Sequence, residues 1–251
     1  MTWVESASPS FRARHDSEHA GAAVRLLASL ERAREQLAER FPRTVPDVTV
    51  IMHSGGLSLS LSNPPVALTW LFTAPAARRY IAGWAAGDEL HVLSPAALRA
   101  RASNVPGSRE MLALTAPALL ARRVIAENNA DLPRALTPAR LAAELRWAWL
   151  LEGAGRWFAG QIEHARPAIA RRLHEGRRPE FPPRLRDAAL LGGTVIDLLA
   201  REEGEPAAAQ FVTRLHPQGA RAALTRAFGG RSLARTEGVW RAHLARMAGT
   251  V

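Results

Sequence analysis

The spacing of apolar residues changes along this chain, and the change limits the folds that it can adopt. Alternating apolar and polar residues over 10–15, and an apolar β-branched run over 48–52, predict β-strands. The segments 79–84 and 89–93 flank a Gly-Asp turn signal, so they predict a β-hairpin. Ser94-Pro95 ends this part of the chain. We therefore expect the strands to lie in its first half.

Helical spacing accounts for most other segments. Asp16 or Ser17 is expected to cap a long helix that ends near Arg40, because apolar residues recur there at helical spacing. Gly, Ser and Pro residues after residue 52 predict a loop, and 66–72 is interpreted as a further strand. The later helices are expected from Ser108 to about Asp131 with Pro117 as a kink or break, from a Thr137-Pro138 cap to about Phe158, and over 163–174, 184–203, 206–215, 218–228 and 232–247.

A sheet followed by a helical remainder is typical of the α+β class. We expect a small N-terminal mixed sheet with one long helix, followed by an all-helical C-terminal subdomain. An α/β subdomain is predicted over 1–132 and a helical subdomain over 133–251. The 251 residues suffice for one large domain or two small ones.

All 33 basic residues are arginines, and the formal net charge is +10. Residues 131–251 carry 19 arginines against 12 acidic residues. Such an excess of positive charge is typical of surfaces that bind nucleic acid or other anions. The arginines are spread through the predicted helices without aromatic residues between them, so a nucleic-acid partner is not expected. The absence of cysteine excludes thiol catalysis and Cys-ligated zinc, and the absence of lysine excludes Schiff-base chemistry.

No segment is predicted to enter a membrane. Residues 1–5 lack the basic and apolar regions of a signal peptide. The uncharged stretch 48–77 contains Gly55-Gly56, Asn63 and Pro64-Pro65, which interrupt a spanning helix. We expect a cytoplasmic protein without a membrane partner.

One helical segment resembles a zinc peptidase. Trp149–Phe158 reads WLLEGAGRWF and resembles the helix that carries the third zinc ligand in gluzincins, which belong to the zincin-like, peptidase-MA-like family. Residues 82–84 and 90–95 are similar to the edge hairpin that leads into the metal-binding helix of that family, and 188–199 and 240–244 are similar to its helical tail. The resemblance implies a zincin-like fold, in which a small twisted sheet packs on the active-site helix and a helical subdomain closes the cleft.

The catalytic residues of that family are replaced in this chain. In H-E-x-x-H, two histidines on one helical face bind zinc, and the glutamate polarises the bound water. The matching stretch has Glu127 at the first histidine position, Asn128 at the general-base position and Asp131 at the second histidine position. Glu152 matches the third ligand, and Trp157 lies in the same preserved segment. The resemblance therefore implies a degenerate site without zinc and without standard zinc-hydrolase chemistry.

Helical spacing places three carboxylates on inward-facing stripes. Glu127 and Asp131 continue one apolar stripe, and Glu152 continues another. A buried carboxylate needs a partner. In an arginine-rich chain an ion pair is the simplest solution, and the nearby candidates are Arg122, Arg123, Arg146 and Arg156. The alternative is an oxygen-only site for Mg²⁺, Ca²⁺ or Mn²⁺ built from the three carboxylates.

The histidines give weaker indications. His15 to His19 matches the inverted zinc motif H-x-x-E-H, which requires both histidines on one helix. The expected cap at Asp16 or Ser17 puts His15 at a strand end, so this zinc site is not expected. His91 alternates with apolar neighbours and is interpreted as a surface residue of a strand, and His53 as part of a loop that could contact a ligand.

Together these observations predict a catalytically inactive zincin-like protein that acts as a binding or scaffold module and holds a peptide or protein segment in its cleft. A metal-dependent hydrolase with carboxylate or histidine ligands is the alternative, and a basic nucleic-acid-binding protein is the third hypothesis. No cofactor is expected, and zinc least of all, although the three-carboxylate alternative requires a hard divalent cation.

Overall fold

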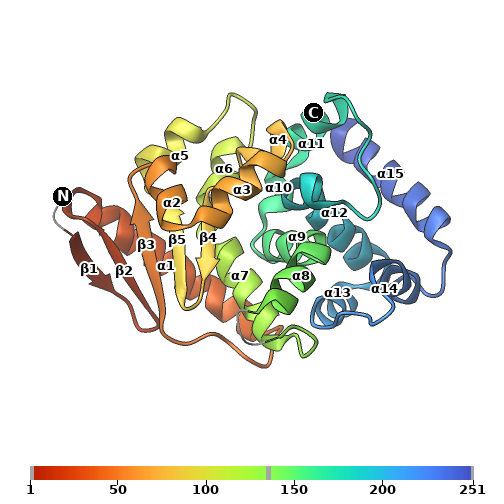
Figure 1. Cartoon of the computed structure of the whole chain (residues 1–251), viewed down its shortest axis with the longest axis horizontal. Coiled ribbons are helices and arrows are strands. Elements are labelled where there is room, and N and C mark those ends of the chain that lie inside the picture. The colour runs from red at the N-terminus through yellow and green to blue at the C-terminus, as the bar shows by residue number, and fades with distance from the viewer. Residues whose placement is uncertain (1–2, 134–136, 250–251) are drawn as a thin grey trace.

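The computed structural model describes residues 3–133 and 137–249, and it has the α+β architecture that the sequence predicts. A five-stranded sheet forms one end of the molecule, and helices form the rest (Figure 1). Met1 and Thr2, part of the segment considered as a signal peptide, lie outside the described residues.

The sheet has the order β1-β2-β3-β5-β4. Its strands are β1 (Trp3–Ala7), β2 (Phe11–Asp16), β3 (Val48–His53), β4 (Gly83–Ala86) and β5 (Glu89–Leu93). The three central strands are parallel, while β1 and β4 run antiparallel to their neighbours at the two edges. Ala13, Val50 and Leu90 lie side by side on adjacent central strands and are fully buried, which fixes the register.

The strands predicted over 10–15 and 48–52 are confirmed. The hairpin ending at Leu93 is also confirmed, but its first strand lies over Gly83–Ala86 and not over 79–84. Strand β1 was not predicted, because its side chains are mostly exposed and do not alternate. The mixed sheet is therefore one strand wider than its apolar pattern indicates.

The long N-terminal helix is confirmed as α1 (Ala20–Ala38), which buries a stripe that includes Leu27, Leu30 and Leu37 and contacts β1 and β2. A short 3-10 turn (Ser17–His19) precedes it. The side chain of Asp16 makes no capping hydrogen bond, so the expected cap at this point is wrong.

Two predictions for the segment after β3 are wrong. The expected loop contains helix α2 (Gly56–Ser62), and the strand predicted over 66–72 is helix α3 (Pro64–Phe72). Pro64 and Pro65 occupy the first turn of α3, where a missing N–H costs nothing. Continuous apolar runs fit a buried strand or a helix equally well, and here the run forms a surface helix.

Helices α4 (Pro75–Arg78) and α5 (Pro95–Arg101) were not predicted. The remaining helices agree with the predicted ranges to within a few residues, although several are divided. They are α6 (Ser108–Ala113), α7 (Thr115–Asn128), α8 (Pro138–Arg146), α9 (Ala148–Phe158), α10 (Gln161–His164), α11 (Arg166–His174), α12 (Leu185–Glu203), α13 (Glu205–Val212), α14 (Ala220–Ala227) and α15 (Leu233–Gly249). The chain breaks before Thr115 and at Trp147, and Pro117 lies inside α7. The cap at Thr137 is confirmed, because its hydroxyl accepts a hydrogen bond from Arg140 N at 3.2 Å.

Glycines allow α9 to approach two helices at once. A Cβ at Gly153 would overlap the backbone of Gly192 on α12. A Cβ at Gly155 would lie 2.7 Å from Ala118 O on α7 and 3.0 Å from Arg122 Cβ. Backbone contact on both sides fixes α9 between α7 and α12.

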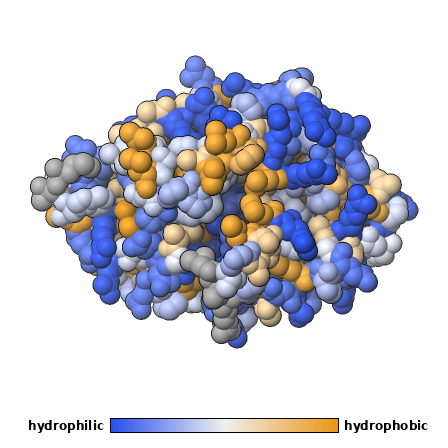
Figure 2. Space-filling view, viewed as in Figure 1, coloured by the Kyte–Doolittle hydropathy of each residue, from blue (hydrophilic) through white to orange (hydrophobic). Residues whose placement is uncertain are grey.

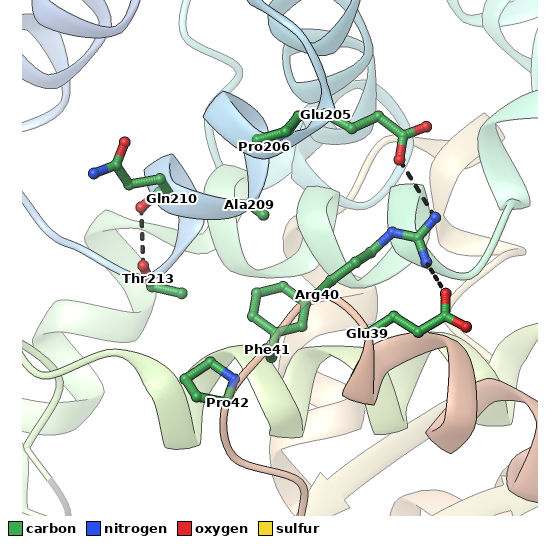
Figure 3. A pocket seen from close by; sticks show the side chains of 9 residues that line it. All are labelled: Glu39, Arg40, Phe41, Pro42, Glu205, Pro206, Ala209, Gln210 and Thr213. Atoms are coloured by element: carbon green, nitrogen blue, oxygen red, sulfur yellow. Dashed lines mark hydrogen bonds and ion pairs between the residues drawn. The ribbon is translucent and has the colours of Figure 1, made fainter.

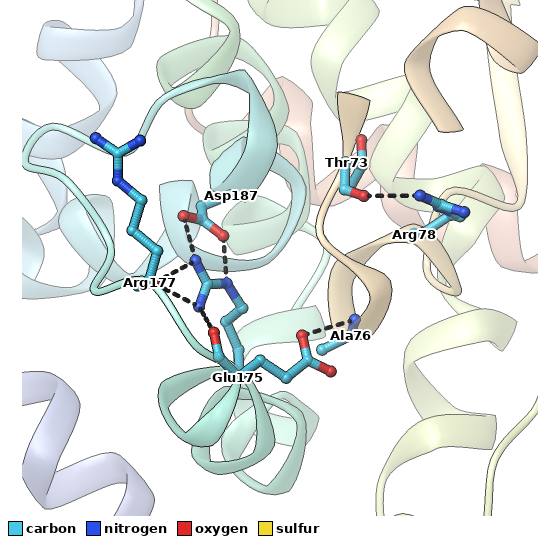
Figure 4. Close-up of polar contacts among 7 residues, drawn as sticks. Thr73, Ala76, Arg78, Glu175, Arg177 and Asp187 are labelled. Carbon is cyan, nitrogen blue, oxygen red and sulfur yellow. Dashed lines mark hydrogen bonds and ion pairs between the residues drawn. The ribbon is translucent and has the colours of Figure 1, made fainter. Parts of the chain in front are cut away.

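A buried ion pair joins α11 to the start of α12. The guanidinium of Arg172 donates to both carboxylate oxygens of Asp187, with 2.9 Å between Nη2 and Oδ2, and both side chains are almost fully buried. Arg172 also donates to the carbonyl oxygens of Glu175 and Arg177. Figure 4 shows this network beside the contact of Glu175 with Ala76 N, so one arginine organises the connection between the two helices.

One hydrophobic core runs through the molecule and contains residues of both predicted subdomains, such as Val124 of α7 and Leu150 of α9. The shared core does not mark a boundary between the two subdomains, so their division after residue 132 stays a prediction. Among the described residues, no helix combines the length and the apolar character needed to cross a bilayer.

Candidate functional site

The carboxylate of Glu152 meets a guanidinium. Arg122 on α7 places its Nε 3.0 Å from Oε1 of Glu152 on α9 and its Nη2 3.3 Å from Oε2 of Glu144 on α8. Arg140 holds Glu144 from the other side at 2.8 Å. The interpretation as an arginine–carboxylate pair is thus confirmed for Glu152, with Arg122 as the partner.

Strand β4 contributes an aromatic residue to the same place. The guanidinium carbon of Arg122 lies 5.6 Å from the ring centroid of Trp84, within the range of a cation–π contact. We call Trp84, Arg122, Glu144 and Glu152 the Arg122 cluster. It joins the edge of the sheet to α7, α8 and α9.

A second arginine lies behind this cluster. Arg156, one turn after Glu152, is buried and donates to Gln161 Oε1 at 2.9 Å and to Tyr80 O at 3.0 Å. Burial lowers the pKa of Arg156, and the charge of Glu152 opposes this effect. Arg156 therefore places a second positive charge one turn along α9 from Glu152.

The other residues of the predicted degenerate site lie apart from Glu152. The side chain of Glu127 is half exposed, and its Oε1 lies 3.9 Å from Arg43 Nη1. The side-chain amide of Asn128 forms hydrogen bonds with the backbone N–H and C=O of Arg43. Asp131 accepts hydrogen bonds from Arg214 Nε at 3.0 Å and from Leu215 N at 2.8 Å. The carboxylates thus have separate arginine partners.

No three His, Asp or Glu side chains converge on a point suitable for a metal ion within residues 3–133 and 137–249. Trp157, the remaining predicted position, points to α12, where its Nε1 donates to Asp197 Oδ1 at 3.3 Å. The predicted positions therefore divide among four places in the fold.

The histidines of the inverted zinc motif do not share a helix. His15 is buried at the end of β2, with its two ring nitrogens 2.9 Å from Ser6 Oγ and 2.7 Å from Asp16 O. His19 lies in the 3-10 turn, 3.4 Å from Glu18. Both rings thus have local partners, as expected for a strand-to-helix junction.

A hollow opens between α3 and α8 in the space-filling view, with hydrophobic residues gathered on both sides of it (Figure 2). The exposed large side chains of these helices are Leu68, Leu71 and Phe72 on α3 and Leu141 and Leu145 on α8. Exposed apolar groups beside a hollow are typical of a binding site.

Strand β4 is the free edge of the sheet next to α7. Leu93 N donates to Ala82 O at 3.2 Å, so the alternating antiparallel pattern directs the polar backbone atoms of Trp84 and Ala86 toward β5. The N–H and C=O of Ala85 then point away from β5. An extended chain could pair with them.

Two open grooves lie elsewhere. One of about 520 Å³ is bordered by the end of α1 and by α13, and Figure 3 shows Arg40 in it between Glu39 and Glu205. The other, of about 340 Å³, is lined by Asp47, Asp88, Arg123 and Glu127 among others. Neither is lined by Arg122 or Glu152, so both are separate from the Arg122 cluster.

The interpretation of His53 and His91 is wrong in both cases. His53 is the last residue of β3, His91 lies on β5, and both are buried. Their rings face each other with 3.0 Å between His53 Nε2 and His91 Nδ1. The alternation around His91 places it on a face of the sheet, and only the position of α2 decides that this face is covered.

No protein-family model, curated protein or solved structure matches this chain. The argument for function therefore depends on the geometry of the site.

Proposed function

We propose that this chain is a zincin-like protein without zinc-hydrolase chemistry, which binds an extended peptide or protein segment in the hollow between α3 and α8. The observation that carries the proposal is the contact of Glu152 with Arg122. In the family that this chain resembles, the glutamate of this helix binds zinc. In this chain the guanidinium of Arg122 supplies the positive charge beside Glu152 instead. A guanidinium cannot activate water as a metal does.

The surroundings of the Arg122 cluster suit a peptide. Ala85 on β4 offers one N–H and one C=O to an added strand, and Trp84 lies beside it. The exposed side chains of α3 and α8 offer apolar contact on either side. Strand addition supplies affinity through the main chain, while the apolar walls select side chains at alternate positions.

The test is a selection of binders from a random peptide library displayed on phage, followed by affinity measurements with synthetic peptides. Selected peptides are expected to carry apolar residues at alternate positions and to lose affinity in two variants. Ala85→Pro removes the outward N–H and should weaken binding by about three- to tenfold. Leu71→Asp places a charge on the α3 wall, where the side chain is 70% exposed and its replacement costs little stability.

Matched controls lie elsewhere on the surface. Ala7→Pro introduces the same change at an outward-facing position of the opposite edge strand, because Ser8 N bonds to Phe11 O and sets that pattern. Val24→Asp replaces a side chain on α1 that is 59% exposed. Both controls should bind the peptides as the unmodified protein does.

Two results would overturn the proposal. One is a failure to select any peptide, or peptides whose affinity is the same in all four variants. The other is cleavage of peptides in the presence of zinc, lost on chelation and in Glu152→Ala, which would identify an active metallopeptidase.

A further inference from the structure

The buried histidines at the end of β3 and in the middle of β5 form a pair that the peptide-binding proposal does not use. His53 lies opposite Leu93 in the sheet, so His91 is its diagonal neighbour on the same face. The ring planes differ by 23° and the ring centroids are 5.3 Å apart. His53 is 5% exposed and His91 is 6% exposed, so water competes little for the facing nitrogens.

Each ring has an oxygen partner at its outer nitrogen. Glu89 Oε2 lies 3.2 Å from His91 Nε2, and Ser58 Oγ on α2 lies 3.3 Å from His53 Nδ1. Metal-binding histidines have the same arrangement, in which one nitrogen binds the ion and an oxygen holds the other.

The partners determine where the protons are. Ionised Glu89 only accepts, so His91 donates from Nε2 and its Nδ1 is left as an acceptor. His53 then donates from Nε2 to His91, and its own Nδ1 accepts from the hydroxyl of Ser58. In this arrangement each ring carries one proton and is neutral, the state in which imidazole binds metals.

We propose that His53 Nε2 and His91 Nδ1 bind a late first-row transition-metal ion between them. Imidazole suits zinc and copper ions, and a zinc–nitrogen bond is about 2.0–2.1 Å long. Two such bonds at a tetrahedral angle need nitrogens about 3.3 Å apart, so the observed 3.0 Å must open by a few tenths of an ångström.

The chain of hydrogen bonds can accommodate the ion without losing a proton. When the ion replaces the hydrogen between the rings, the proton of His53 moves from Nε2 to Nδ1 and is donated to Ser58 Oγ. The hydroxyl of Ser58 then donates to Gly55 O, which already lies 3.2 Å away. His91 keeps its proton on Nε2 and its bond to Glu89. Every group stays paired and both ligands stay neutral.

Two imidazoles leave coordination positions open. Within the described ranges no third His, Asp or Glu converges with these two rings on a metal position, so water or a small ligand would complete the coordination. Such a site resembles open metal sites more than closed structural ones.

The test uses tag-free protein titrated separately with Zn²⁺ and with Cu⁺ against a competing chelator. One ion per chain is expected for at least one metal, with loss of that binding in His53→Gln and in His91→Gln. Ser58→Ala should weaken binding by about tenfold or more, because it removes the group that orients His53. His174→Gln replaces an exposed histidine and serves as the matched control.

A second measurement needs no variant and holds even if the substitutions unfold the protein. Nitrogen NMR of the imidazoles should show that the ion shifts the resonances of His53 Nε2 and His91 Nδ1 and leaves the other histidines unchanged. The absence of stoichiometric binding would overturn the proposal. So would metal-induced shifts confined to His15 and His19, or unchanged affinity in folded His53→Gln and His91→Gln proteins.

Discussion

Arg122 Nε lies 3.0 Å from Glu152 Oε1, and this contact joins α7 to α9. The same guanidinium reaches Glu144 on α8, so one cation serves two carboxylates. A metal ion would join helices in the same way, through charge and several bonds at once.

Removal of this cation should destabilise the protein. Arg122→Met removes the ion pairs of Arg122 with Glu144 and Glu152. We expect the free energy of unfolding in urea to fall by about 1–3 kcal/mol. In the double variant with Glu152→Gln, the loss should be smaller than the sum of the single losses by at least about 0.5 kcal/mol. Additive losses would mean that the two residues do not interact.

The crossing of α9 and α12 should tolerate no side chain at Gly153. Gly153→Ala forces a methyl group into the backbone of Gly192, so we expect a loss of about 1–3 kcal/mol or more in the same assay. Gly238→Ala on α15 is the control, because nothing lies within 4 Å of the added carbon. It should raise stability by up to about 1 kcal/mol. Equal effects of the two substitutions would contradict the close approach.

The buried pair of Arg172 and Asp187 should matter far more than an exposed pair. Arg172→Met leaves the Asp187 carboxylate buried without its partner, which we expect to cost about 3–5 kcal/mol. Arg184 pairs with Glu180 at 2.7 Å, but its side chain is 77% exposed. Arg184→Met should therefore change the free energy of unfolding by no more than about 1 kcal/mol. Similar losses in both variants would contradict this ranking.

The buried histidine pair should make stability depend on pH. Burial and the neighbouring His91 lower the pKa of His53 from its ordinary 6.5 to about 4. Between these values the unfolded chain takes up a proton that the folded chain does not. The free energy of unfolding should therefore fall as the pH decreases from about 6.5 to about 4, by on the order of 3 kcal/mol.

Urea unfolding over this pH range measures the effect, with His53→Gln as the variant that removes the titrating group. Its stability should depend less on pH than that of the unmodified protein. His174→Gln should keep the original dependence, since that residue is exposed. Identical pH dependence in all three proteins would show that His53 is not held neutral.

Local chemistry in the sequence was enough to predict much of the fold. The strand over 10–15 alternates, and the cap at Thr137 is a local contact. Tertiary contacts decided the rest. The apolar run over 66–72 fits a strand or a helix, and β1 has too few buried side chains to be recognised.

The candidate site was likewise predictable only in part from the sequence. The inward position of Glu152 follows from helical spacing, and an arginine partner was expected. The choice of Arg122 depends on where α7 and α9 cross, which Gly155 allows and no local pattern reveals. The pairing of His53 with His91 likewise depends on which strands are neighbours in the sheet.

The glycine contacts of α9 also determine where this protein is free to change. Helix α9 touches the backbones of both α7 and α12, so substitutions there disturb three helices together. The exposed side chains of α3 and α8 carry no such constraint. Over evolutionary time, α3 and α8 can exchange these exposed side chains while α7, α9 and α12 keep their packing.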